Sequence, residues 1–112
     1  MSFHNSADLT PAAPRAGAER RLAYESGVLF LSIVFEAGFE MAPHSHSWPA
    51  LYYITHGTGR ATVGKEQKDL QPGVLAMIPA GAVHGIKATT RLSLIEVQTD
   101  CPQQFVDGLL GR

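Results

Sequence analysis

The feature that most limits the fold of this chain is a series of short apolar runs divided by glycine and proline. Residues 28–36 (VLFLSIVFE) and 91–97 (RLSLIEV) are rich in large apolar and β-branched side chains, which favour strands. The turn signals Pro72-Gly73 and Pro79-Ala80-Gly81 separate further runs of this kind. Because no segment shows the spacing of a long amphipathic helix, the pattern predicts an all-β protein, built as an antiparallel sandwich or barrel.

Strands are expected from residue 28 to residue 97, and one or two helical turns are expected over residues 103–110. The first strand is an uninterrupted apolar run, long enough to be buried on both faces. The expected strand ranges are 28–36, 41–47, 51–55, 60–63, 67–70, 74–78, 84–88 and 91–97.

The length of 112 residues suits one domain. Residues 1–19 are rich in Ala, Pro, Ser and Gly and lack periodicity, so they are expected to form a flexible arm before a barrel domain over residues 20–112. No run reaches the roughly 18 apolar residues of a membrane helix, so no membrane partner is expected. The single cysteine, Cys101, excludes an intramolecular disulfide and favours a reducing cytoplasm.

The charge distribution argues against a nucleic-acid partner. The formal net charge is −1, and among the nine Lys and Arg residues only Arg20 and Arg21 are adjacent. Phosphate recognition needs clustered cationic side chains. A small-molecule ligand is the expected partner.

Two of the five histidines form the pair His44-Ser45-His46. On a strand, residues two apart point to the same face, so both imidazoles project together. His84 follows a turn and opens another expected strand, and three imidazoles would converge if the two strands were neighbours. Three histidines with an open position form a catalytic type of metal site. The pair alone is equally compatible with histidines that bind no metal.

The frame around these histidines resembles two motifs of the cupin superfamily. Residues 38–57 read G-FEMAP-HSH-SWP-A-LYYITH-G, and residues 73–88 read G-VLAMI-PAG-AV-H-GIK-A. The spacings match the family's Gly, His-x-His and Gly in the first motif, and its Gly, Pro-x-Gly and His in the second. The resemblance implies a jelly-roll barrel with a metal inside its mouth, and it suggests a homodimer.

Two positions depart from the family pattern. The family's glutamate ligand falls on Ala50 and its asparagine falls on Ala88, and neither alanine can bind metal. The resemblance then implies a three-histidine site that holds one divalent transition metal per chain. Iron, zinc, nickel, copper or manganese fits such ligands, with iron or zinc favoured over the rest. Without a carboxylate ligand, the ion keeps its charge and favours an anionic ligand such as a carboxylate or an enolate.

Strand parity suggests which residues line the pocket. Counted from His44, even positions face inward, which places Trp48, Tyr52 and Ile54 beside a substrate, with Met77 as a further contact. Tyr52 is a candidate to position the substrate or donate a proton, and the alternative is a core aromatic. His56 has the same parity but lies at a turn, where a rim position is expected rather than a fourth metal ligand.

Glu96 is an isolated acid within an apolar strand. On an inward face it would serve as a general base, and on an outward face it would only be solvated. The outward position is the one expected here.

Two classes of function remain open at this point. Three-histidine cupins include iron dioxygenases that act on diketones and thiols, so the resemblance favours a dioxygenase-like enzyme acting on a small anionic or enolisable substrate. A metal-dependent isomerase or lyase on a sugar-like substrate is a related alternative. A non-catalytic module that binds a small molecule or metal is the other class, because a fold does not fix a function.

Overall fold

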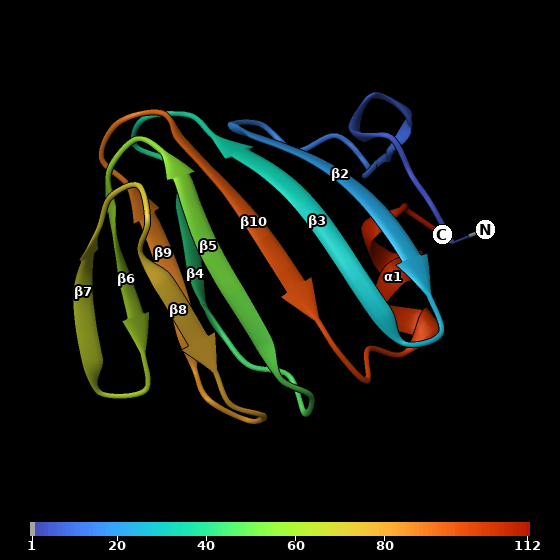
Figure 1. Ribbon diagram of the computed structural model, residues 1–112. Helices are drawn as coiled ribbons and strands as arrows, with labels where there is room; N and C mark the ends of the chain where they lie inside the picture. The colour runs from blue at the N-terminus through green and yellow to red at the C-terminus, as the bar shows by residue number, and fades with distance from the viewer. Residues whose placement is uncertain (1) are drawn as a thin grey trace.

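Two antiparallel sheets face each other in the computed structural model, which describes residues 2–112 (Figure 1). One sheet has the strand order β1-β2-β3-β10-β5-β8 and the other has the order β4-β9-β6-β7. The strands are β1 (Thr10–Pro11), β2 (Ala18–Glu25), β3 (Val28–Phe35), β4 (Glu40–His44), β5 (Ala50–His56), β6 (Gly59–Val63), β7 (Glu66–Leu70), β8 (Leu75–Ile78), β9 (His84–Ala88) and β10 (Leu92–Gln98). A 3-10 turn, η1 (Ser6–Asp8), precedes them and α1 (Gln103–Leu109) follows them. The prediction of an all-β antiparallel jelly roll is confirmed.

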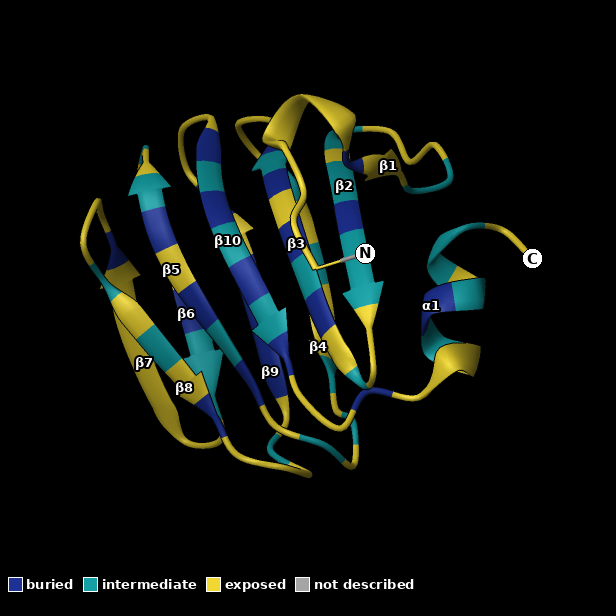
Figure 2. Cartoon of the chain, turned by 45° about the vertical axis from the view of Figure 1, so that its right-hand side comes forward, coloured by how far each residue is buried: buried dark blue, intermediate teal, exposed yellow. Residues whose placement is uncertain are grey.

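The inner faces of the two sheets form the core, and the central strands alternate accordingly (Figure 2). On β3, Leu29, Leu31, Ile33 and Phe35 are buried, whereas Ser32 is exposed. Burying a side chain of this size contributes roughly 1.5–3 kcal/mol. The expectation that residues 28–36 are buried on both faces is therefore wrong, because this sheet is covered on its inner face only.

Each of the expected strands exists, and β9 has the expected bounds. The strand β2, which pairs with β3 along its whole length, is not among the expected strands. The adjacent polar residues Arg20 and Arg21 interrupt the apolar pattern there, although Leu22 is buried in the core. The helix α1 lies within the range predicted for it.

The N-terminal segment lies against the sheet. Leu9 is buried, Thr10 and Pro11 pair with β2, and the N–H of Ala13 donates to the carbonyl oxygen of Leu109 at 2.8 Å. Of the predicted flexible arm over residues 1–19, Met1 lies outside the described residues, and β2 already begins at Ala18. The flexibility of this segment stays a prediction.

The residues that the structure describes include no helix with the length and hydrophobicity needed to cross a membrane.

Candidate metal centre

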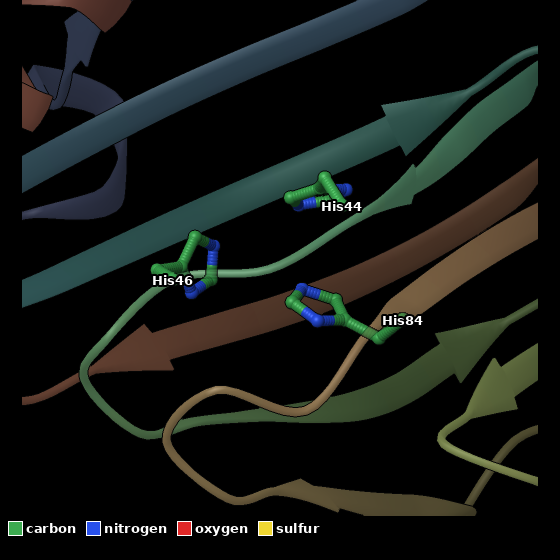
Figure 3. A group of neighbouring side chains, drawn as sticks. All are labelled: His44, His46 and His84. Carbon is green, nitrogen blue, oxygen red and sulfur yellow. The ribbon is translucent and has the colours of Figure 1, made fainter.

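Three histidines, two on adjacent strands and one in the loop after β4, turn toward a common space (Figure 3). His44 ends β4 and faces His84, the first residue of β9, in the strand register. His46 lies two residues beyond the end of β4. The nearest ring centroids are those of His44 and His84, 4.3 Å apart, and each histidine offers a nitrogen within 4.8 Å of the others. The structure thus brings together the three histidines that the sequence singled out.

The local backbone explains why the histidines converge. β4 is an edge strand, and its register with β9 shifts between Met41 and His44, a bulge of the kind that re-aims side chains. Gly85 on β9 permits this close approach, because a Cβ there would lie 3.0 Å from the carbonyl oxygen of Met41. The loop carrying His46 is fixed by the N–H of Gly81, which donates to the His46 carbonyl at 2.7 Å.

Backbone carbonyls orient two of the rings. The Ala42 carbonyl lies 3.0 Å from Nδ1 of His44, and the Ala82 carbonyl lies 2.9 Å from Nδ1 of His84. A carbonyl oxygen only accepts, so each Nδ1 carries the proton and each Nε2 keeps its lone pair. In metal-binding histidines, a hydrogen bond from the ring nitrogen that does not bind the metal fixes the tautomer in this way.

Three of the remaining ring nitrogens are buried without hydrogen-bond partners, and this feature tests whether a metal fits. Both nitrogens of His46 and Nε2 of His84 are buried and make no hydrogen bond. Burial lowers the pKa of His46 below its ordinary value, helped by the neighbouring His84 and His44, and burial also lowers the pKa of His84. The rings of His46 and His84 are therefore neutral near pH 7, as metal ligation requires. Three converging imidazoles with nitrogen lone pairs fit a divalent transition metal.

Aromatic packing holds His46 in place. The Trp48 ring stacks on it with centroids 5.0 Å apart, and Phe105 of α1 meets both rings edge-on. The indole N–H of Trp48 donates to Oε1 of Gln98 at 2.7 Å. Trp48 therefore packs against His46, and it is not among the residues that line the neighbouring pocket of His44 and His46.

A pocket of about 350 Å³ opens beside His44 and His46. Its walls come from both sheets and from α1, and they combine an apolar surface with a few polar groups. The polar and charged lining residues are Arg15, Arg20, His44, His46, Glu96 and Gln98. Apolar side chains of β3 and α1 complete the wall, including Leu31, Ile33, Phe35 and Leu109.

The prediction that Glu96 faces outward is wrong. Glu96 is only 6% exposed and lines the pocket, because β10 turns Leu92, Leu94, Glu96 and Gln98 inward. Its Oε2 accepts a hydrogen bond of 2.8 Å from Nε2 of Gln98. Burial raises the pKa of Glu96 to about 7, partly offset by that bond. Glu96 lies outside the histidine group and is the one acidic side chain in the pocket wall.

A pH-dependent stability follows from this buried carboxyl. The folded chain holds the Glu96 proton up to about pH 7, whereas the ordinary pKa is 4.5. Stability is therefore full below pH 4.5 and falls as pH rises to 7, by up to about 3 kcal/mol. We expect Glu96→Gln to remove this loss, so that the metal-free variant is more stable than wild type at pH 8. Urea unfolding of both proteins with chelator at pH 4.5, 6 and 8 measures the difference, and a difference that is constant with pH would contradict it.

The other predicted site residues lie around the pocket or away from it. Tyr52 is buried behind His84, with ring centroids 6.0 Å apart, and its hydroxyl has no hydrogen-bond partner. Burial and the neighbouring Glu96 raise its pKa well above the ordinary value, so the phenol stays protonated. Ile54 is a core residue, 1% exposed. His56 is exposed at the end of β5, outside the histidine group.

Met77 is placed on the outer face of the sheet and is 63% exposed. The alternation of β8 buries Ile78 and turns Met77 away from the core. It lines a different cavity, of about 610 Å³, between β6, β7 and β8. Met77 therefore lies outside the histidine pocket, and the prediction that it contacts a substrate there is corrected.

Some pocket residues were missed in the sequence. Gln98 follows from the inward parity of β10 once Glu96 is known to face inward. Phe105 comes from α1, and Arg15 and Arg20 come from the N-terminal segment and β2, which carried no strand signal. Ala50 and Ala88 are buried in the core, and their methyl groups offer no metal ligand.

The fold and the histidine group define a small β-barrel protein with three converging imidazoles. The family model for the cupin domain matches residues 31–98, more than half of the 112 residues. The chain therefore belongs to the cupin family. No curated protein matches it in sequence.

Solved structures agree on the fold. A RmlC-like cupin from Shewanella frigidimarina is 21% identical, with 94% of this chain and 96% of that chain covered and a TM-score of 0.85. KdgF from a Halomonas species is 19% identical, with 93% and 99% covered and a TM-score of 0.83. A predicted oxalate decarboxylase from Thermotoga maritima is 22% identical, with 85% and 96% covered and a TM-score of 0.72. At these identities the likeness shows the fold alone.

Proposed function

We propose that this protein is a metal-dependent enzyme in which His44, His46 and His84 hold one divalent transition metal, preferably iron or zinc. Its substrate is a small anionic or enolisable molecule. The observation that carries this proposal is the meeting of three imidazoles, two of them with buried nitrogens that lack partners, beside a pocket that His44 and His46 line. Burying unpartnered polar atoms costs free energy, and a bound ion would remove that cost.

Oxidative cleavage by dioxygen is the reaction that we propose first. A divalent ion on three imidazoles would supply Lewis acidity and, as iron, the capacity to activate dioxygen. The chain itself supplies a base, since Glu96 is the acidic residue in the pocket wall and its pKa of about 7 suits proton transfer near neutral pH. Gln98 orients this carboxyl through its hydrogen bond. The apolar side chains Ile33 and Phe35 help to exclude water.

A metal-dependent isomerase or lyase on a sugar-like substrate is the second candidate. The inward position of Glu96 favours it, because such reactions begin with removal of a proton from carbon and need no oxidant. With Glu96 in its wall, the pocket holds an acid–base residue for that proton transfer beside the metal ligands.

The two reactions are separated by paired assays. The iron-loaded protein is expected to consume oxygen with at least one member of a panel of β-diketones, thiols and flavonols, and Glu96→Gln is expected to slow this by roughly 10²- to 10⁴-fold for enolisable substrates. The zinc-loaded protein is incubated with hydroxyketone sugars in D₂O, and deuterium at carbon is followed by NMR. Exchange without oxygen consumption would reassign the protein to the second candidate. If the protein shows neither activity but binds one of these compounds tightly, it would be assigned as a binding module.

We further propose a cytoplasmic homodimer that buries the outer face of the six-stranded sheet. Support comes from Val28, Tyr53, Leu75 and Met77, large apolar residues that are 44–63% exposed on strands of this sheet. Exposed apolar patches of this kind mark interaction surfaces. Sedimentation is expected to give a dimer at micromolar concentration, which Tyr53→Lys weakens. A monomer at that concentration would contradict the proposal.

A further inference from the structure

The arginines of this chain fall into two groups. Among residues 2–112, four arginines pair with carboxylates, and their side chains are 43–68% exposed. These pairs are Arg21 with Glu19, Arg60 with Asp69, Arg91 with Glu36 and Arg112 with Asp107. The remaining two, Arg15 and Arg20, both line the histidine pocket.

Arg20 is held in the pocket wall and pairs with no carboxylate of residues 2–112. Its Nη2 donates to the Ala13 carbonyl at 3.0 Å, while its Nε is buried and has no hydrogen-bond partner. Its pKa is lowered by burial and by the nearby charge of Arg15. A buried guanidinium N–H without an acceptor costs free energy, which an anion in the pocket would recover.

Apart from the histidines, Arg15 and Glu96 are the other charged residues that line this pocket. The Arg15 guanidinium is held over the Phe39 ring, 5.1 Å from its centroid. Glu96 shares the pocket but pairs with neither arginine, and its own hydrogen bond comes from Gln98. The two cationic groups are therefore available to a ligand.

We propose that Arg20, assisted by Arg15, is a carboxylate-binding subsite of the histidine pocket. Arg20 comes from β2 in the six-stranded sheet, and His44 comes from β4 in the other sheet, so the two lie on opposite walls. A ligand that bridges them carries a carboxylate at one end and an oxygen donor for the metal at the other. The substrate class is a small keto acid or dicarboxylate. Guanidinium and carboxylate match in geometry as well as in charge. This inference deepens the proposed function and depends on it for the metal end only.

Calorimetric binding of malonate to the zinc-loaded protein tests the subsite. Arg20→Gln is expected to weaken malonate binding by roughly tenfold to a hundredfold without changing the zinc content. Arg21→Gln is the matched control, because it removes the same charge one residue away at an exposed pair. Malonamide, the neutral analogue, is expected to bind weakly and equally to all three proteins. Arg15→Gln serves as a second variant, with a loss in the same direction, if Arg20→Gln unfolds.

The outcomes separate the subsite from the proposed function. Equal malonate affinity in Arg20→Gln and Arg21→Gln would overturn the subsite. A wild-type protein that binds no malonate would also overturn it. Inorganic phosphate that binds more tightly than malonate, in an Arg20-dependent manner, would overturn the carboxylate assignment. If wild type holds no zinc but the metal-free protein still binds malonate through Arg20, the subsite is supported and the metal-dependent function fails.

Discussion

Replacing His84 with alanine is expected to abolish the rise in unfolding temperature that zinc produces in the wild-type protein. A ligand at a hundred times its Kd stabilises the folded state by about 2.7 kcal/mol. For a domain of this size that corresponds to a rise of roughly 10 °C or more. His84 faces His44 across the strand register. Replacing it with alanine removes one of the three imidazoles that would bind the ion. Thermal unfolding with and without zinc measures the shift.

The matched control is His56→Ala, an exposed histidine outside the group. This variant is expected to keep the full zinc-dependent shift. His44→Ala, at a less buried position, repeats the test if His84→Ala fails to fold. A full shift in both His84→Ala and His44→Ala would remove these residues as ligands.

The largest effect on folding is expected for Gly57→Ala. Gly57 has φ of +84°, and a Cβ there would overlap the carbonyl oxygen of Arg91, the residue just before β10. The left-handed backbone costs about 1–2 kcal/mol for an L-residue. The overlap with backbone adds to this, so we expect a total loss of about 4 kcal/mol or more in the free energy of unfolding. Urea unfolding of the purified variant measures it.

Gly38→Ala is the control for the backbone term alone. Gly38 has φ of +87°, but nothing lies within 4 Å of the position that an added Cβ would take. This variant is expected to lose only about 1–2 kcal/mol. Equal losses in the two variants would show that the close approach to Arg91 contributes nothing.

The sequence predicted the histidine group well because its determinants are local. A His-x-His pair keeps both rings on one side whether the backbone is a regular strand or an extended loop, so the early end of β4 at His44 did not matter. Fixed spacing from the glycine and proline turns placed His84 opposite. The strands followed from apolar runs that face a buried interior.

The rest of the pocket depends on which face of each strand is buried, and that is set by tertiary packing. Glu96 sits in a strand whose inward positions are otherwise apolar or polar but uncharged, so an outward acid was the natural expectation. β2 carries Arg20 and Arg21 where an alternation of apolar residues would indicate a strand. The sequence pattern therefore predicts neither this strand nor the inward position of Arg20. Such exceptions to local rules are expected at functional sites.

The most direct test of the metal centre is the metal content of the chain, purified without a histidine tag. Protein incubated separately with iron(II), zinc, nickel, copper and manganese, and then desalted, is analysed by plasma mass spectrometry. We predict close to one ion per chain for iron or zinc, and close to none in His84→Ala. Wild-type protein that retains none of the five metals would contradict the three-histidine metal centre.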